Sequence, residues 1–199
     1  MTLPGFFTGT GMPDPGWWEA LWPEPARVLA QTGVTANMTV IDLCSGDGWF
    51  TWQLAKLARA VIAIDIDAKL LATARLRLTE NGLTNCQYVE ADAYDLPQRI
   101  AVAVDHVFLA NAFHGVPDKP RLIQAIAAVL KPAGVLAIVN WHARPREQTP
   151  VLGEPRGPAT ELRLTPAATI ASVEPNGFTL RTVVDVSPHH YGAVFERTA

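Results

Sequence analysis

Short segments rich in apolar residues alternate along the chain with segments in which apolar residues recur every three or four positions. The apolar segments have the length of buried strands and span residues 38–43, 61–65, 87–91, 104–110 and 135–140. Strands that alternate with helices are typical of a parallel sheet covered by helices on both faces. The pattern therefore predicts an α/β protein with a three-layer Rossmann-like sandwich.

The segments between the strands carry apolar stripes at helical spacing. Residues that begin helices precede three of them, namely Asp67, Asp118 and Thr165. The stripes are Phe50, Leu54, Leu57 and Ala58; Leu71, Ala74 and Leu78; and Leu122, Ile126, Val129 and Leu130. A further helix is expected from Thr165-Pro166 to about Asn176-Gly177.

The last part of the chain has a different pattern. Two strands, 178–186 and 191–196, are separated only by a short turn, which favours antiparallel pairing. We therefore expect a seven-stranded, mostly parallel sheet with an antiparallel last strand. Between residue 140 and about residue 163 lies a proline-rich loop without periodicity, and loops of this length are often lids or binding elements.

The first 36 residues lack the alternation of strands and helices. Asp14-Pro15 can begin a helix that carries Trp17, Trp18, Leu21 and Trp22. The economical interpretation is an N-terminal helical extension, residues 1–36, which is a possible lid, followed by one domain of residues 37–199.

Composition and charge narrow the class of protein. Of the 199 residues 49% are hydrophobic and 18% charged, which makes an extended disordered chain improbable. The net charge is -3 and no cluster of basic residues occurs. Duplex nucleic acid and anionic membranes attract basic surfaces, so we expect neither nucleic acid nor membrane as a partner.

The location expected from the sequence is the cytoplasm. The first basic residue is Arg27, so the N-terminus resembles neither a secretory signal nor a transit peptide, and no apolar run has the length of a membrane span. Only two cysteines occur, Cys44 and Cys86, which gives no disulfide framework. We expect a monomer or a homodimer, and no metal site.

The most informative segment for function runs from Val40 to Phe50, where a strand passes through a turn of small residues into a helix. Gly46 and Gly48 allow the backbone to approach a ligand closely, and the following helix N-terminus offers free amides. Such a loop suits a dinucleotide or S-adenosylmethionine (SAM). A Gly-x-Gly pair alone is weak, because ordinary turns also contain it.

Three carboxylates help to choose between these cofactors. Asp65 ends the second strand 19 residues after Gly46, where it can accept hydrogen bonds from a ribose in either cofactor. Asp42 lies at the end of the first strand, where it would face the ammonium group of a methionine but repel a pyrophosphate. Asp92 follows the third strand and can bind an adenine amine. The third glycine of the dinucleotide motif is absent, so SAM is favoured.

These segments resemble the class I SAM-dependent methyltransferases, especially the small-molecule branch that includes the ubiquinone-biosynthesis type. The resemblance covers about residues 38–140. It rests on four motifs in order: Asp42-Leu-Cys-Ser-Gly-Asp-Gly48; Ala63-Ile-Asp-Ile-Asp67; Glu90-Ala-Asp-Ala-Tyr-Asp-Leu-Pro97; and Asn111-Ala-Phe-His-Gly-Val-Pro-Asp118 with Val129-Leu-Lys-Pro-Ala-Gly134.

The resemblance implies roles for individual residues and makes residues 37–199 the methyltransferase domain. Asp42 and the turn Cys44–Gly48 would hold the methionine end of SAM, Asp65 the ribose, and Asp92 with the amide of Ala93 the adenine. Ile66 would also contact the cofactor, and Asn111 would lie beside the transferring methyl group. Two positions depart from the family pattern, since Cys44 and Ala133 stand where the family has glycine.

The substrate end is less informative, and each candidate has a structural alternative. His114, just after the fourth strand, is the best candidate for a general base, but a histidine here can also organise the loop. Trp141 and His142 follow the fifth strand at the same edge. Tyr191 either packs at the last strand or contributes to the pocket.

Aromatic and basic residues add two further hypotheses. Trp17, Trp18 and Trp22 either cover a flat or cationic acceptor or fasten a helix to the sheet. Arginines in the long loop either meet an anionic group on the substrate or, because glutamates interleave with them, form a solvated surface of mixed charge. These arginines are Arg144, Arg146, Arg156 and Arg163.

The sequence as a whole predicts a SAM-dependent methyltransferase that acts on a small molecule, with the methylated atom open. One alternative is a NAD(P)-dependent oxidoreductase with a Rossmann fold. Another is a protein that binds SAM without catalysis.

Overall fold

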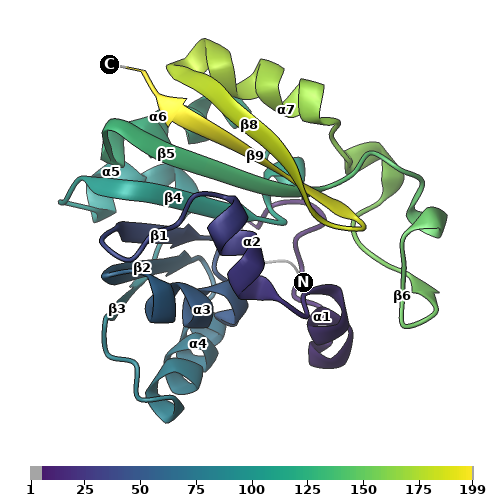
Figure 1. Cartoon of the computed structure of the whole chain (residues 1–199), viewed down its shortest axis with the longest axis horizontal. Helices are drawn as coiled ribbons and strands as arrows, with labels where there is room; N and C mark the ends of the chain where they lie inside the picture. The colour runs from purple at the N-terminus through teal and green to yellow at the C-terminus, as the bar shows by residue number, and fades with distance from the viewer. Residues whose placement is uncertain (1–5, 199) are drawn as a thin grey trace.

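A computed structural model describes residues 6–198. A seven-stranded sheet lies between two layers of helices (Figure 1), as the alternation of strands and helices predicts. Its strand order is β3-β2-β1-β4-β5-β9-β8. The strands are β1 Thr39–Leu43, β2 Ala60–Asp65, β3 Cys86–Glu90, β4 Val104–Ala110, β5 Leu130–Trp141, β8 Phe178–Ser187 and β9 His190–Arg197.

The last strand is antiparallel to the rest of the sheet, which confirms the predicted topology. β9 pairs antiparallel with β5 on one side and with β8 on the other. The short turn between β8 and β9 allows only a hairpin, so β9 inserts between β5 and β8 and leaves β8 at the edge. The first five strands are all parallel to one another, so their carboxyl ends lie along one edge of the sheet.

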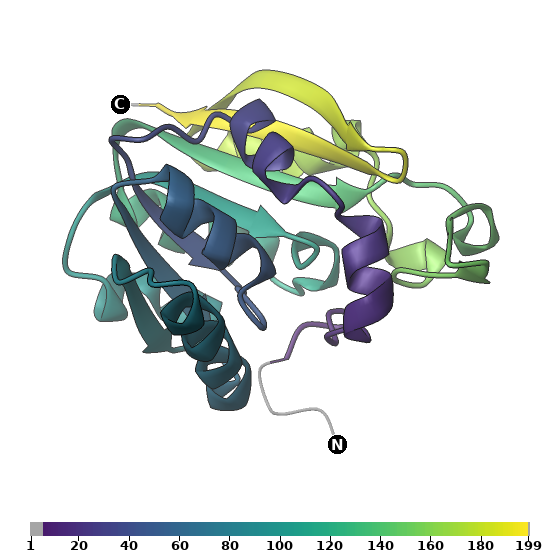
Figure 2. The same cartoon turned by 60° about the horizontal axis from the view of Figure 1, so that its bottom comes forward.

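Three helices cover each face of the sheet (Figures 1 and 2). Helices α2 Pro25–Gln31, α3 Trp49–Leu57 and α4 Ala68–Glu80 lie on one face. The other face carries α5 Leu96–Arg99, α6 Lys119–Val129 and α7 Pro166–Val173. The three predicted caps are confirmed: the side chains of Asp67, Asp118 and Thr165 accept hydrogen bonds from backbone amides in the first turns of α4, α6 and α7.

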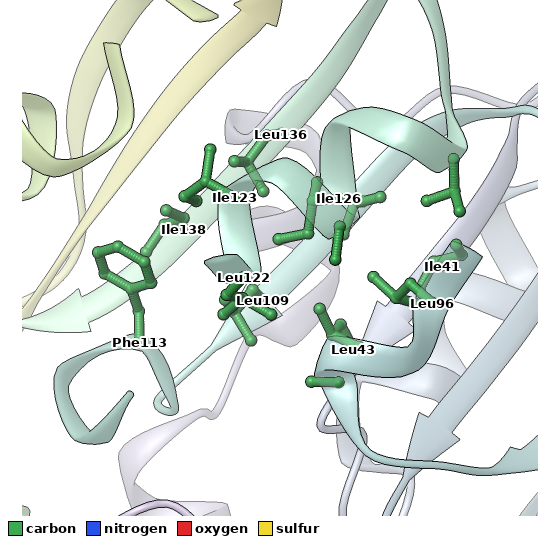
Figure 3. Close-up of a cluster of buried hydrophobic side chains, with 14 of the residues drawn as sticks. Ile41, Leu43, Leu96, Leu109, Phe113, Leu122, Ile123, Ile126, Leu136 and Ile138 are labelled. Atoms are coloured by element: carbon green, nitrogen blue, oxygen red, sulfur yellow. The ribbon is translucent and has the colours of Figure 1, made fainter. Parts of the chain in front are cut away.

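Both faces of the central strands are buried, which explains why these strands read as nearly continuous apolar runs. Alternate residues of β1 point to opposite sides: Ile41 and Leu43 contribute to the cluster beneath α6, whereas Val40 belongs to the cluster beneath α3. Figure 3 shows the α6 side of the core, where Ile123 and Ile126 pack on strand residues. Within residues 6–198, no helix is long and apolar enough to cross a membrane.

The N-terminal segment forms two helices instead of the one that the sequence predicts. The expected helix is α1 Pro15–Leu21. The Asp14 side chain makes no capping hydrogen bond, so the start of the helix is favoured by Pro15 at its first position instead. The unexpected α2 lacks a polar cap and is held by burial of Val28 and Leu29. Its stability therefore comes from packing, which the local sequence does not reveal.

The long loop after β5 is more ordered than its proline content suggests. It holds a two-stranded hairpin, β6 Pro150–Val151 and β7 Glu154–Pro155, between two 3₁₀ turns. Strand β5 itself begins at Leu130, five positions before the expected start, because Leu130 already pairs with Val104 ahead of an irregularity in the register. The predicted last helix ends at Val173 and continues as a 3₁₀ turn, Glu174–Asn176.

Both departures from the family's glycines fall where the backbone is left-handed. Cys44 and Ala133 each have φ of 58°, a region that costs a side chain roughly 1–2 kcal/mol. Glycine is the residue that this backbone geometry favours, and this chain tolerates the strain of a small side chain at both positions.

Replacing Ala133 by glycine should stabilise the protein. The exposed Ala133 side chain loses no packing, and the relief of a positive φ outweighs the extra entropy of unfolded glycine by about 0.5–1 kcal/mol. For a chain of this size, we expect the melting temperature to rise by about 1–4 °C. Ala72→Gly, at an exposed position inside α4, is the matched control and should lower it. A fall with Ala133→Gly would contradict the prediction.

Candidate active site

A cavity lies where the carboxyl ends of the parallel strands meet the N-terminal segment and the long loop. Its position agrees with the general placement of ligands in open α/β sheets. Most of the residues selected from the sequence line it: Trp17, Trp18, Asp42, Cys44, Gly46, Asp65, Ile66, Asp92, Ala93, Asn111, His114 and Trp141.

The loop after β1 contains two glycines with different structural roles: one packs against α4 and the other lines the cavity. Gly46 and Gly48 have φ of 56° and 83°. A Cβ on Gly48 would lie 2.6 Å from the Ala74 Cβ and 2.8 Å from its Cα, so Gly48 serves the packing of α4 and does not line the cavity. Gly46 does line it, and a Cβ there would lie 2.6 Å from the sulfur of Met12.

Asp65 is held at the end of β2 by two backbone amides. One carboxylate oxygen accepts a hydrogen bond from the Gly46 amide at 2.8 Å, and the other accepts one from the Asp67 amide at 3.0 Å. Burial raises the pKa of Asp65, and the two amides act against this rise. Each carboxylate oxygen keeps a lone pair for a ligand, so the side chain is fixed in place and still able to accept hydroxyl groups.

Asp42 is an almost fully buried acid whose carboxylate accepts a hydrogen bond from the Thr51 hydroxyl at 2.5 Å. Burial raises the pKa of Asp42 to about 7, the Thr51 bond lowers it, and the nearby Asp65 raises it further. A carboxylate in this position is stabilised most by a bound cation. The geometry therefore suits a ligand with an ammonium or sulfonium group.

Two buried polar side chains beside these acids lack partners. Neither atom of the Asn111 amide, nor the Ser45 hydroxyl, has a hydrogen-bond partner among residues 6–198, and both residues line the cavity. Asn111 also has a φ of 56°. Buried polar groups are normally satisfied and strained backbone gathers at ligand sites, so these groups are suited to bind a polar ligand.

His114 lies in the 3₁₀ turn after β4, Phe113–Gly115. Its Nε2 is 3.1 Å from the carbonyl oxygen of Gly9, which fixes the proton on Nε2 because a carbonyl can only accept. Burial lowers the pKa of His114. The ring is therefore neutral at pH 7. Its buried Nδ1 carries a lone pair and has no hydrogen-bond partner among the described residues, and the neighbouring Asn140 side chain acts against the fall in the pKa.

The N-terminal segment of residues 6–13 passes across the cavity, and we call it the strap. The strap backbone at Thr8 is so close to Gly115 that a Cβ there would lie 2.0 Å from the Thr8 oxygen. At one end the ring of Phe7 meets Tyr94 edge-on at 5.8 Å, and at the other Met12 lies on Gly46. Sequence reasoning missed the strap because no periodicity marks an irregular segment.

Some of the tryptophans line the cavity, and one fastens the N-terminal segment to the sheet. Trp22 is buried, with its ring 5.2 Å from Phe50 and 4.3 Å from His190, so it fastens the N-terminal segment to the sheet. Trp17 and Trp18 line the cavity. Trp141 does so as well, and Gly157 lies directly against its ring.

The four arginines of the long loop also differ in position, since two line the cavity and two do not. Arg163 is buried and donates to the carbonyls of Pro158, Arg144 and Arg156, which organises the loop. Arg144 donates to a carbonyl next to β9, outside the cavity. Only Arg146 and Arg156 line the cavity. Neither was distinguishable in sequence from the other two.

Two residues selected for the substrate do not reach the cavity. His142 binds Asp185 at 3.0 Å, and the buried Tyr191 hydroxyl bonds with Thr169 at 2.7 Å and donates to the Leu164 carbonyl at 3.1 Å. Tyr191 points to the face covered by α7, because successive residues of a strand alternate between faces. Its interpretation as a packing residue fits this position.

Comparison with known proteins agrees with the geometry. The family model described as "Methyltransferase domain" matches residues 40–134. A SAM-dependent methyltransferase from Aquifex aeolicus superposes with a TM-score of 0.77 at 24% identity, over 93% of this chain and 94% of that one. Residues 40–134 thus match a methyltransferase domain, and the chain has the fold of a SAM-dependent methyltransferase. The nicotinamide-dependent alternative has no support from these matches.

The curated relatives include enzymes with different acceptors. The 2-phytyl-1,4-naphtoquinone methyltransferase of Nostoc sp. is 33% identical over 64% of this chain and 56% of its own length. The tRNA 5-carboxymethoxyuridine methyltransferase of Escherichia coli is 27% identical over 62% of this chain and 47% of its own length. The chain thus spans about half the length of the curated relatives it matches, and its methyl acceptor must be argued from the site.

SAM is the cofactor of this methyltransferase family, and the cavity fits it. The fit rests on the buried acid Asp42, which a cation would stabilise, and on the unpartnered amide of Asn111. Asp65 is fixed with free lone pairs at the end of β2. In the described residues no group of three metal-ligating side chains occurs.

Affinity for SAM should depend on pH through Asp42. The free carboxyl has a pKa of about 7 and must be ionised to meet a cation, so binding below pH 7 releases a proton. We expect the affinity, measured by calorimetry, to rise by up to about tenfold per unit between pH 5.5 and 7 and then to level. Asp42→Asn should bind more weakly with a flat profile over this range. An equally steep profile in Asp42→Asn would assign the titration to another group.

Proposed function

We propose that the chain transfers a methyl group from SAM to a small-molecule acceptor. The observation that carries the proposal is the set of acids at the strand ends, all of which line the cavity and two of which, Asp42 and Asp65, are buried. In this proposal Asp42 and the turn of Cys44 to Gly46 hold the methionine end and Asp65 holds the ribose. Asp92 and the amide of Ala93, next to Ile66, hold the adenine.

In the proposed site Gly48 does not contact the cofactor; it packs against Ala74 of α4 and so supports the turn on the side away from the cavity. Asn111 would lie near the methyl group, with its otherwise unpartnered amide directed to the methionine moiety. The cofactor supplies an activated methyl group when bound. The residues of the chain hold the two reactants in line and exclude water, which is most of what such a displacement needs.

We further propose that His114 accepts the proton of the acceptor. Its tautomer leaves Nδ1 free, and its lowered pKa keeps the ring neutral, which are the two requirements for a base at pH 7. The bond to the Gly9 carbonyl supports a second task, which is to hold the strap over the cavity. The base assignment favours an acceptor with an ionisable hydroxyl, because such a group must lose a proton on methylation.

A small acceptor is supported by the lining of the cavity. Residues of the strap and the rings of Trp17, Trp18 and Trp141 line the same cavity as the residues assigned to the cofactor. We propose that residues 1–36 act as a lid on the methyltransferase domain of residues 37–199. A net charge of -3 also favours a small molecule over tRNA, although one relative modifies tRNA.

The cellular location and the oligomeric state are also proposals. Cys44 and Cys86 are free thiols, which supports a reducing compartment such as the cytoplasm. A monomer or homodimer suffices, because every group assigned above comes from one chain.

The proposal is tested by incubating the protein with SAM and a panel of hydroxylated, amino and thiol compounds, with a tRNA pool as a further arm. Release of S-adenosylhomocysteine with a small molecule is the expected result. Release only with tRNA would contradict the small acceptor. Tight SAM binding without release of S-adenosylhomocysteine in any arm would favour a non-catalytic SAM-binding protein. Thermal stabilisation by NADH but not by SAM would overturn the assignment of SAM as the cofactor.

A further inference from the structure

Charge is unevenly distributed around the cavity. Its lining contains four acids, Asp42, Asp47, Asp65 and Asp92, which lie at the carboxyl ends of β1 and β2 or just after β1 and β3. Its two arginines, Arg146 and Arg156, both come from the long loop after β5. A cationic cofactor is attracted to the first side, and an anion is attracted to the second.

Arg156 is positioned but has no acidic partner. Its guanidinium lies over the ring of Trp17 at 5.5 Å, and its buried Nε has no hydrogen-bond partner among residues 6–198. Its backbone is fixed because its carbonyl accepts hydrogen bonds from Arg163 at 2.9 Å and from the Thr149 hydroxyl at 3.1 Å. A guanidinium with an unused buried donor, held by a rigid loop, is suited to bind an oxyanion.

Arg146 lies beside it on the same wall. Its Nε donates to the carbonyl of Gly157 at 3.1 Å, and its backbone amide donates to the Thr160 hydroxyl at 3.0 Å. Among the described residues neither Arg146 nor Arg156 forms an ion pair. Glu147, the acid next in sequence, acts on the buried Arg163 instead.

The same part of the cavity is aromatic. Trp17, Trp18 and Trp141 line it, and Gly157 lies flat on the Trp141 ring because any side chain there would clash with it. Aromatic walls beside arginines bind flat molecules that carry a negative charge, since the rings stack and the guanidinium groups bind the anion.

We propose that Arg146 and Arg156 form an anion subsite, and that the methyl acceptor is a flat compound with a carboxylate or phosphate group. The subsite rests on the proposed function for its role, because it would orient the acceptor toward the cofactor. Carboxylate and phosphate share the chemistry that two guanidinium groups recognise, and the experiment separates them.

The test measures equilibrium binding to the full chain saturated with S-adenosylhomocysteine, so no turnover is needed. Two matched pairs of probes are used: 4-hydroxybenzoate with 4-hydroxybenzamide, and phenyl phosphate with its uncharged dimethyl ester. Quenching of tryptophan fluorescence or calorimetry gives each dissociation constant. We expect one anion to bind at least about tenfold more tightly than its neutral partner, with the preference falling as salt is raised.

Variants assign this preference to the two side chains. Arg156→Gln and Arg146→Gln should each reduce it severalfold, and Arg156→Lys should retain part of it. Arg144→Gln, on the same loop but outside the cavity, is the matched control and should leave it unchanged. Binding of S-adenosylhomocysteine itself, and the melting temperature, should stay the same in all four variants, which separates the subsite from folding.

Three results would overturn the subsite. They are equal binding of charged and neutral probes, an unchanged preference in both glutamine variants, and failure of both anions to bind at millimolar concentration. Failure of the wild-type chain to bind S-adenosylhomocysteine would instead count against the proposed function. Tighter binding of phenyl phosphate than of 4-hydroxybenzoate would identify a phosphorylated acceptor, and the reverse a carboxylic acid.

Discussion

Replacing Asp65 by alanine should abolish the thermal stabilisation that SAM gives to the protein. In the proposed site this carboxylate accepts both ribose hydroxyls, and each charge-assisted hydrogen bond contributes about 1.5–3 kcal/mol. Loss of two such bonds weakens binding by more than about a hundredfold. At a SAM concentration of about 100 times the dissociation constant, wild-type stabilisation is about 2.7 kcal/mol. This corresponds to a rise of roughly 5–10 °C in melting temperature, which the variant should lack.

The control must separate the ligand from the loop, because Asp65 also holds the Gly46 and Asp67 amides. Asp65→Asn keeps an acceptor oxygen for one of them and should fold more stably than Asp65→Ala, yet bind SAM almost as weakly. Asp67→Asn is the matched variant: it lies two positions away, caps α4 and does not line the cavity, so its response to SAM should be normal. Undiminished stabilisation of Asp65→Asn by SAM would refute the ribose assignment.

Replacing His114 by alanine should lower kcat by about a hundredfold or more, provided that the acceptor is a hydroxyl group. General bases contribute roughly 10²–10⁴-fold, and the free Nδ1 is the group that would take the proton. Because burial lowers the pKa of His114, the wild-type rate should stay constant through pH 7 and fall only below the ordinary histidine range. The His114→Ala variant should lose this acid limb of the profile.

His114→Gln distinguishes the base from the support of the strap. The amide nitrogen of glutamine can replace Nε2 as the donor to the Gly9 carbonyl, but the side chain cannot accept a proton at neutral pH. We expect kcat in His114→Gln to be as low as in His114→Ala, with KM closer to wild type. Recovery of kcat by glutamine would identify His114 as a positioning residue for the strap.

The strands and their directions follow from local patterns, because burial on both faces leaves nearly continuous apolar runs in the central strands. The runs around Ile41 and Val107 are mostly apolar, and Asp67 and Asp118 cap helices through contacts within a few residues. The acids at the strand ends could be predicted for a similar reason. Parallel strands bring their carboxyl ends to one edge, so topology alone places Asp42, Asp65 and Asp92 together.

Features that depend on contacts between distant segments could not be predicted in this way. Helix α2 has no side-chain cap, only Pro25 at its first position, and it is stabilised by burial of Val28 and Leu29 against the rest of the chain. The bond between His114 and Gly9 joins residues 105 positions apart. No local pattern encodes such a pair, so the strap was invisible in the sequence.

The arginines of the long loop show the same difference between what local sequence predicts and what depends on tertiary contacts. Sequence supplies four similar side chains on one loop, and the folded loop buries Arg163 among carbonyls, turns Arg144 away and leaves Arg146 and Arg156 at the cavity. By itself the sequence determined the fold class, the helix caps and the acids at one end of the cavity, because these depend on short-range periodicity and on residues at strand ends. Only the tertiary structure decided which aromatic and basic side chains line the cavity, because that depends on how a loop and a strap with no regular pattern pack across the sheet edge.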